Sequence, residues 1–315
     1  MTAPDAAALP PRFGSARADA PDAELRYTAV CVAVFCWGVG PLLVRGISAP
    51  SGTIVLYRLW IAAPVMMIAA YVARTPLTWE VARRSVPGGL MFAASVLTGF
   101  ASFQQTSVAN ATLITALTPV IVLPIAARYF GERVTRRSLL CAAVSVAGVV
   151  AVVFGAAPDG SASLTGDLLA IGDLIAFTAY FLEMKRQRTA GVPALPLLAG
   201  VMLTAAIAVT PIVLLSGDDL TAIGGWDWLW LLVLVFGVGA VGHGLMAWAH
   251  RHVDVTISSL LTLGSPVISA IGAWLVFQQS LTAVQLAGAV LVLLGLVGVV
   301  VASPRPTAEV VIDTT

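Results

Sequence analysis

The chain has 315 residues, of which 59% are hydrophobic and only 10% are charged, and its mean hydropathy is +0.95. Because soluble domains are nearer a quarter charged, this composition excludes a soluble globular protein and indicates an integral membrane protein. The formal net charge of +1 gives no reason to expect a nucleic-acid partner. The three cysteines, Cys31, Cys36 and Cys141, lie inside apolar runs without disulfide or metal-ligand spacing.

Residues 1–26 are rich in Ala, Pro and Asp, so we expect them to form a disordered cytoplasmic arm. A membrane-spanning helix needs about 20 apolar residues. Two uncharged stretches are too long for one span, and we divide them at Asn110 and near residues 278–280. The expected spans are residues 27–44, 52–72, 87–108, 111–127, 138–155, 166–184, 195–215 and 228–249, and two more within 255–304. The sequence thus predicts an all-α integral membrane fold with ten transmembrane helices.

An internal repeat organises these helices. Residues 113–155 and 260–301 share one plan: an apolar run with a proline, a polar hinge, and a second apolar run containing glycine. Pro119 and Pro266 are equivalent positions 147 residues apart, as are Gly148 and Gly295. Because each repeat holds an odd number of spans, the two halves are predicted to be inverted, which is typical of secondary transporters. We assign residues 27–155 to a first five-helix repeat, 166–302 to a second, and 303–315 to a cytoplasmic tail.

The basic residues predict the orientation of the chain. With the N-terminus inside, every one of the 17 Lys and Arg residues except Arg45 and Arg58 falls in a cytoplasmic segment. Cytoplasmic loops carry an excess of Lys and Arg. We therefore expect both termini in the cytoplasm.

Several motifs together point to a family. They are Trp37-Gly38, Arg58, the run TSVANATLITALTPV followed by GER, and the run AHRHVDVTISSLLTLGSPV. This combination resembles the drug/metabolite transporter superfamily, in particular its EamA-type branch. The resemblance covers residues 27–301 and departs at Gln278-Gln279, where the family usually has Gly-Glu. It implies a transporter of the cell inner (plasma) membrane whose first, third, fourth, sixth, eighth and ninth helices line a central cavity.

Charged side chains inside a membrane are costly and point to function. Asp173 is a candidate to bind a cationic substrate or a proton, and the alternatives are hydrogen bonding between helices only or a shallow position near the outer headgroups. Arg58 is a candidate to receive a substrate carboxylate or to pair with Asp173, and the alternatives are a structural pair or snorkelling. His243 is the only histidine within an expected span, so it joins Asp173 as a candidate for proton coupling, with an interhelical hydrogen bond as the alternative.

The other candidate substrate-binding residues are uncharged. Proline kinks a helix and frees a carbonyl, so Pro119 and Pro266 mark a candidate pathway, unless Ser or Thr hydroxyls satisfy those carbonyls. The remaining candidates offer a ring, an amide or a hydroxyl within a span, with packing as the alternative for the rings. They are Trp37, Gln104, Thr115, Tyr180 and Thr262.

Ionisable groups near the expected helix ends receive structural interpretations. Glu132 is expected to favour the dipole of the helix that it precedes and to pair locally with neighbouring arginines. Glu183 is expected to pair with Lys185 or Arg186. His250 and His252 lack a third ligand for a metal and are interpreted as solvated.

The predicted function is secondary active transport of a small metabolite, amino acid or drug-like compound by alternating access, with efflux favoured and a proton as candidate coupling ion. The alternatives are an uncoupled facilitator or uniporter, and a non-transporting membrane scaffold or sensor. The chain has no HExxH, GxSxG or Walker motif, so we predict no enzyme activity and no cofactor. The expected partners are a small-molecule substrate, the lipid bilayer and the candidate proton, and both a monomer and a homodimer stay open.

Overall fold

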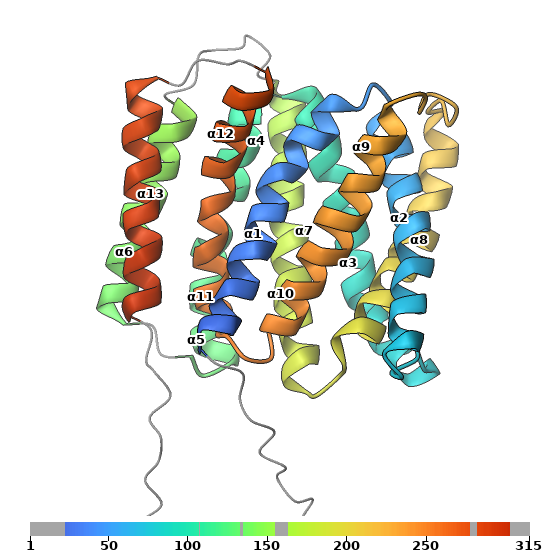
Figure 1. Ribbon diagram of the computed structural model, residues 1–315, viewed down its shortest axis with the longest axis horizontal. Helices are drawn as coiled ribbons and strands as arrows, with labels where there is room; N and C mark the ends of the chain where they lie inside the picture. The colour runs from blue at the N-terminus through green and yellow to red at the C-terminus, as the bar shows by residue number, and fades with distance from the viewer. Residues whose placement is uncertain (1–22, 107, 133–134, 155–162, 278–281, 303–315) are drawn as a thin grey trace, which may run out of the picture.

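The computed structural model describes residues 23–106, 108–132, 135–154, 163–277 and 282–302, and every element within these ranges is helical (Figure 1). In the first half the helices are α1 (Ala23–Gly46), α2 (Ser51–Val72), α3 (Trp79–Gln105), α4 (Val108–Thr115), α5 (Thr118–Tyr129) and α6 (Arg136–Phe154). In the second half they are α7 (Leu164–Thr189), α8 (Ala194–Ser216), α9 (Asp227–Val233), the π-helix η1 (Leu234–His243), α10 (Gly244–Ala249), α11 (Val255–Leu261), the 3₁₀ turn η2 (Thr262–Gly264), α12 (Ser265–Phe277) and α13 (Ala283–Ala302).

This architecture confirms the prediction of an all-helical membrane protein. Within the described residues, six helices are long and apolar enough to cross a membrane. They are Glu24–Gly46, Ser51–Val72, Trp79–Gln105, Leu164–Thr189, Ala194–Ser216 and Asp227–Ala249. Shorter apolar helices cover Thr118–Tyr129, Leu139–Ala151, Val255–Ser269 and Leu286–Gly295. The first helix begins at Ala23, so residues 23–26 of the expected arm are helical, whereas the rest of the arm and the tail lie outside the described residues.

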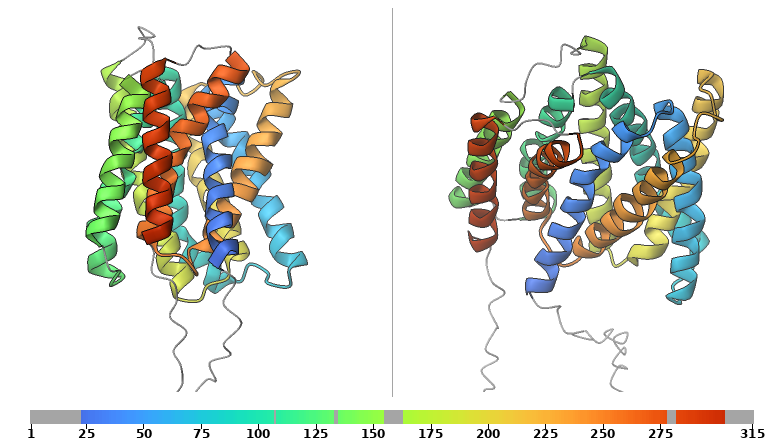
Figure 2. Two further views of the ribbon diagram at one scale, coloured as in Figure 1. Left: turned by 60° about the vertical axis from the view of Figure 1, so that its left-hand side comes forward. Right: turned by 45° about the horizontal axis from the view of Figure 1, so that its top comes forward.

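Figures 1 and 2 show the helices side by side in one bundle. The pair α6 and α13 forms one edge, the pair α2 and α8 lies at the other, and α1, α7 and α12 run between them. The first described residue of α1 and the last of α13 both lie at the end drawn lowest in Figure 1. We call this the lower end of the bundle and the opposite one the upper end.

Two helices are broken in front of the repeated prolines. The chain leaves the helix after Thr115 and re-enters it at Thr118, just before Pro119, and the 3₁₀ turn η2 comes just before Pro266. The carbonyl of Thr115, which the proline ring leaves without an amide donor, accepts a hydrogen bond of 2.7 Å from the hydroxyl of Thr118. The equivalent carbonyl of Thr262 accepts one from the backbone N–H of Ser265. Both carbonyls are therefore hydrogen-bonded, but only that of Thr115 is satisfied by a hydroxyl, as the structural alternative for these prolines expects.

Reciprocal contacts between α6 and α13 indicate an internal two-fold relation. A Cβ atom on Gly148 would lie 2.7 Å from the carbonyl oxygen of Gly288, and one on Gly295 would lie 2.8 Å from that of Cys141. Gly148 and Gly295 are equivalent in the repeat, and so are Cys141 and Gly288. A contact between equivalent surfaces is reciprocal in this way only when a two-fold axis relates them.

We expect Gly148→Ala to destabilise the fold by about 1–3 kcal/mol, because the new methyl group would meet the backbone of the opposite helix and force the pair apart. The matched control is Gly244→Ala, since a Cβ there meets no atom within 4 Å. Unfolding of the purified variants in detergent micelles measures both. Equal stability of Gly148→Ala and the wild type would show that the two helices can separate without cost.

Candidate functional site

A cavity of about 190 Å³ lies between the helices. Its walls come from the later half of α1 and α3 and from the earlier half of α2 and α7, together with the two proline breaks and η1. Because successive helices run in opposite directions, these halves meet between the middle of the bundle and its upper end (Figure 1). Each of the helices expected to line a central cavity contributes lining residues, and α2 adds Arg58. Neither α6 nor α13 contributes a described lining residue.

The cavity wall carries one acidic and one basic side chain among the described residues. Asp173 accepts a hydrogen bond of 2.6 Å from the hydroxyl of Ser95 on α3. Gly99, one turn after Ser95, leaves room for that carboxylate, because a Cβ there would lie 2.7 Å from its Oδ2. Arg58 comes from α2, and its guanidinium carbon lies 5.8 Å from the ring centre of Phe92 on α3. Arg58 and Asp173 form no ion pair, so the pairing of these two residues that the sequence suggested is not observed.

Aromatic rings surround His243 at the middle of the bundle. The imidazole centre is 5.0 Å from the ring centres of both Trp37 and Phe92. The hydroxyl of Tyr180 and Nδ1 of His243 share a hydrogen bond of 3.2 Å. Trp37 also meets Phe177 edge to face at 5.5 Å. The imidazole therefore lies against the cavity with one nitrogen held by Tyr180.

A π-helix, which the sequence did not lead us to expect, positions His243. The segment Leu234–His243 takes this wider helical form between α9 and α10, and His243 is its last residue. Segments of π-helix are rare in proteins, and those that occur often lie at functional sites. The sequence Gly237-Val-Gly239-Ala-Val-Gly242 supplies the flexible backbone, so these glycines are the signal from which an irregular helix here was predictable.

The structure brings seven of the ten candidate binding residues to the cavity wall and leaves three away from it. The seven are Trp37, Arg58, Thr115, Asp173, His243, Thr262 and Pro266. Tyr180 is buried behind His243, and Pro119 is buried next to Thr118, which itself lines the cavity. The lining residues that were not candidates include small and aromatic side chains of α3, among them Ser95, Gly99 and Phe100.

Gln104 was expected at depth but lies exposed at the upper end of α3. Its amide nitrogen donates to the carbonyl oxygen of Ala49, and its amide oxygen accepts from the N–H of Ser51, both at 3.1 Å. The side chain thus completes the backbone hydrogen bonds of the short connection between α1 and α2. A glutamine near a helix end can either face a cavity or hydrogen-bond to a neighbouring connection. The sequence carries no signal that separates these two roles.

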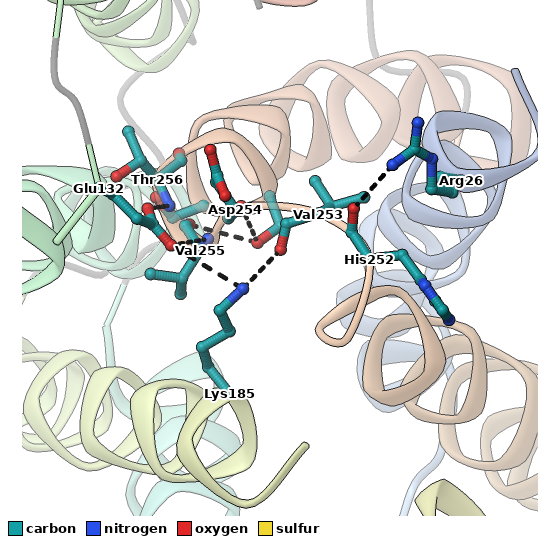
Figure 3. A network of polar contacts seen from close by, with 10 residues as sticks. Arg26, Glu132, Lys185, His252, Val253, Asp254, Val255 and Thr256 are labelled. Carbon is teal, nitrogen blue, oxygen red and sulfur yellow. Dashed lines mark hydrogen bonds and ion pairs between the residues drawn. The ribbon is translucent and has the colours of Figure 1, made fainter. Parts of the chain in front are cut away.

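The lower end of the bundle is closed below the cavity. An apolar cluster fills the space between the two halves there, with Val34 from α1, Val122 from α5, Phe181 from α7 and Met246 from α10 among its fully or almost fully buried members. A polar network lies beyond it (Figure 3). Together they separate the cavity from the lower end.

The polar network centres on Glu132. Its two carboxylate oxygens accept hydrogen bonds of 2.8 and 3.0 Å from the backbone N–H groups of Val255 and Thr256, the first turn of α11. Lys185 of α7 points toward the same carboxylate at 3.8 Å and donates to the carbonyl of Val253 at 2.8 Å (Figure 3). The side chains of Lys185 and Glu132 are only 10% and 6% exposed. Their contacts tie the first half of the chain to two elements of the second half, α7 and α11.

This arrangement corrects the expectation for Glu132. The carboxylate does favour a helix dipole, but the dipole is that of α11, whose orphan N–H groups it satisfies, rather than that of the helix following it in sequence. Gly131, with a left-handed φ of 64°, ends α5 and turns the chain so that Glu132 faces the other half. Glu183 pairs with Arg186 at 2.8 Å as expected, whereas Lys185 is engaged by Glu132 instead.

His250 was expected to be solvated, but it is 1% exposed and its ring packs 4.5 Å from that of Phe181. Burial, together with the positive charges of Lys185 and Arg188, lowers the pKa of His250 to about 3. Since the pKa in the unfolded chain is near 6.5, the folded state binds fewer protons between these values, and its stability is lost as the pH falls below 6.5.

We therefore expect the protein to lose about 2 kcal/mol of stability between pH 7 and pH 5 through this one residue. In His250→Leu that part of the pH dependence disappears, because the leucine cannot bind a proton. His252→Leu, which alters the half-buried histidine of the same turn, keeps the dependence on His250. Unfolding midpoints of the three proteins at pH 5, 6 and 7 measure the difference, and identical slopes would contradict it.

Three comparisons with known proteins agree with this geometry. The EamA-like transporter family matches the chain twice, over residues 25–154 and 164–301. A curated relative, an uncharacterized transporter of Archaeoglobus fulgidus, is 27% identical over 202 residues, which cover 64% of this chain and 70% of the relative. A solved structure described only as the crystal structure of a protein has a TM-score of 0.73 at 20% identity. It covers 89% of this chain and 96% of that chain, and it supports the fold alone. This multi-pass membrane protein therefore belongs to the EamA-like transporter family, as its motifs predicted.

Proposed function

We propose that the protein is a secondary carrier of the cell inner membrane that moves a small molecule by alternating access. The observation that carries this proposal is a charged cavity offset toward one end of a two-fold bundle whose other end is closed. In a carrier of this kind, rocking of the two halves opens one end and closes the other around a site at the middle. In this proposal the cavity is the substrate site, in the state of the carrier in which that site is accessible from the upper end.

The carrier spans the membrane ten times in this proposal. The six long helices supply six spans, counting α9, η1 and α10 as one. The other four are the pair α4 and α5, the pair α11 and α12 with η2, and the helices α6 and α13. Each half then contributes five spans, so the halves are inverted, which agrees with the reciprocal contacts of α6 and α13.

The lower end faces the cytoplasm in this proposal. Basic residues gather there, at the helix ends that Figure 1 draws lowest. Those in the described part of the chain are Arg26, Arg74, Arg83, Arg84, Arg128, Arg136, Arg137, Lys185, Arg186, Arg188 and Arg251. Because short cytoplasmic segments are enriched in Lys and Arg, this distribution supports cytoplasmic termini and a cavity that faces the outside.

Asp173 is the proposed proton-coupling group, with His243 as its partner across the cavity. Both side chains line the cavity, and each is a proton acceptor or donor held by one hydroxyl, from Ser95 and Tyr180 respectively. A group of this kind can exchange a proton with whichever side the cavity faces. The favoured direction is efflux of the substrate in exchange for protons.

The test is uptake into proteoliposomes of labelled amino acids, nucleosides, organic anions and organic cations, with and without a pH gradient. Saturable uptake that requires the gradient is the expected result. Saturable uptake that ignores the gradient would replace proton coupling by facilitated transport. Uptake no greater than that of protein-free liposomes for every compound class would contradict the proposal.

A further inference from the structure

Within the part of the chain that the structure describes, Arg58 is a buried cation with no hydrogen-bond or ion-pair partner. Its side chain is only 4% exposed, and it lines the cavity. Within the described residues it donates no hydrogen bond, and the ion pairs formed there join Arg84 to Glu80, Lys185 to Glu132 and Arg186 to Glu183. Removing a charge from water without pairing it costs several kcal/mol, so proteins rarely leave a buried guanidinium in this state. The guanidinium of Arg58 therefore needs an anionic partner that comes from outside the protein.

The surroundings of Arg58 hold the guanidinium in place but leave its N–H groups available. Its central carbon lies 5.2 Å from the ring centre of Phe100 and 5.8 Å from that of Phe92. Aromatic faces attract a cation without accepting its in-plane N–H groups. The carboxylate of Asp173, which also lines the cavity, accepts a hydrogen bond from Ser95 and forms no ion pair with Arg58. The arrangement is therefore a cation held at the cavity wall rather than a structural ion pair.

We propose that the transported substrate is a small organic acid whose carboxylate binds Arg58, an inference that rests on the proposed carrier function. A guanidinium presents its N–H donors in a planar fork that fits a carboxylate with two parallel hydrogen bonds. Such a pair neutralises the buried cation and offsets the cost of its desolvation. Arg58 is thereby the residue that selects for an anionic head group.

The rest of the cavity sets the body of the substrate. Trp37, Phe92, Phe100 and Phe177 make most of the wall apolar and aromatic. A cavity of about 150 Å³ is large enough to hold benzene. The volume of about 190 Å³ therefore admits a ring-sized apolar group with a short acidic arm. Asp173 is the acidic side chain of the described cavity wall, so it offers a partner to an acid that also carries an amino group.

The experiment compares acids with the corresponding primary amides, in which an uncharged amide replaces the carboxylate, on the purified protein. Phenylacetate is paired with phenylacetamide, and phenylalanine with phenylalaninamide, and binding is measured as ligand-induced thermal stabilisation in detergent micelles. Stabilisation by at least one acid and by neither amide is the expected result. A simple carboxylate that binds as well as the amino acid shows that Arg58 alone reads the head group. Preference for phenylalanine adds Asp173 to the recognition. Equal stabilisation by acids and amides, or none by either acid, overturns the inference.

Variants assign the effect to Arg58. Arg58→Gln is expected to weaken acid binding about 10- to 100-fold, because it removes a charge-assisted hydrogen-bonded pair. Arg58→Lys keeps the charge without the planar fork and should retain an intermediate affinity. Arg45→Gln, which removes an exposed cation near the same end of the bundle, should leave affinity unchanged. Unchanged acid binding in Arg58→Gln overturns the inference, and the wild-type acid and amide pairs decide it even if that variant does not fold.

Transport of the same compounds separates this inference from the carrier proposal. Uptake of neutral or cationic compounds, with acids excluded, overturns the carboxylate site while the carrier function stands. Absence of uptake for every compound overturns the carrier function. If an acid is taken up, and if Arg58→Gln abolishes this uptake whereas Arg45→Gln preserves it, both the carrier function and the carboxylate site are supported.

Discussion

Glu132→Ala is expected to be the most destabilising single substitution in the polar network, at about 3–5 kcal/mol. The variant leaves Lys185 buried without its anionic partner and removes the acceptors of the first two N–H groups of α11. It also disconnects the hinge after α5 from the second half of the bundle. Unfolding of the purified variant in detergent micelles measures the loss.

Glu80→Ala is the matched control, because Glu80 and Arg84 form an exposed pair of 2.7 Å on the surface of α3. Exposed pairs contribute about 0–1 kcal/mol, so this variant should unfold close to the wild type. Glu132→Gln tests the charge separately, since the amide oxygen still accepts from α11 but no longer neutralises Lys185. If Glu132→Ala were as stable as Glu80→Ala, the network would not hold the lower end closed.

Asp173→Asn is expected to reduce the initial rate of substrate uptake about 100-fold or more and to remove its dependence on a pH gradient. The amide occupies the same volume and keeps its contact with Ser95 but can neither release a proton nor balance a cation. The stability of the protein should change little, because no buried ion pair is broken. Rates in proteoliposomes at matched protein content measure the effect.

The chain provides a close control for Asp173 on the same helix. Asp167 lies less than two turns earlier on α7 and accepts a hydrogen bond of 2.7 Å from the hydroxyl of Thr106, but it is not part of the cavity wall. Asp167→Asn therefore makes the same chemical change outside the cavity and should leave transport and its pH dependence intact. Equal losses in both variants would mean that the carboxylates of α7 act through the fold rather than through the cavity.

The sequence was sufficient to predict features that depend on local pattern and on repetition. Apolar length predicted the membrane helices, and the offset between Pro119 and Pro266 predicted two broken helices that the structure indeed places at equivalent positions. Charge in an apolar context identified Asp173, Arg58 and His243, all of which line the cavity. These predictions succeeded because the cost of a charge or a proline in a membrane helix depends little on its neighbours.

Features that depend on contacts across the bundle could not be predicted. The partners of Glu132 are backbone groups more than a hundred residues away, so its local sequence suggested the wrong helix. The predictions for Gln104 and His250 were wrong for the same reason, because the segments that pack against these residues set their environment. Ser95 and Gly99 were overlooked since small residues one turn apart also occur wherever two helices pack closely.

Counterflow in proteoliposomes tests alternating access most directly. Vesicles are loaded with an excess of an unlabelled compound that the protein takes up, diluted, and given a trace of the same compound with a label. A carrier whose site faces one side at a time predicts a transient accumulation of label above its external concentration, absent in Asp173→Asn. Label that rises to the external concentration without an overshoot would contradict the account, since it would show a continuous pathway instead of a site closed at one end.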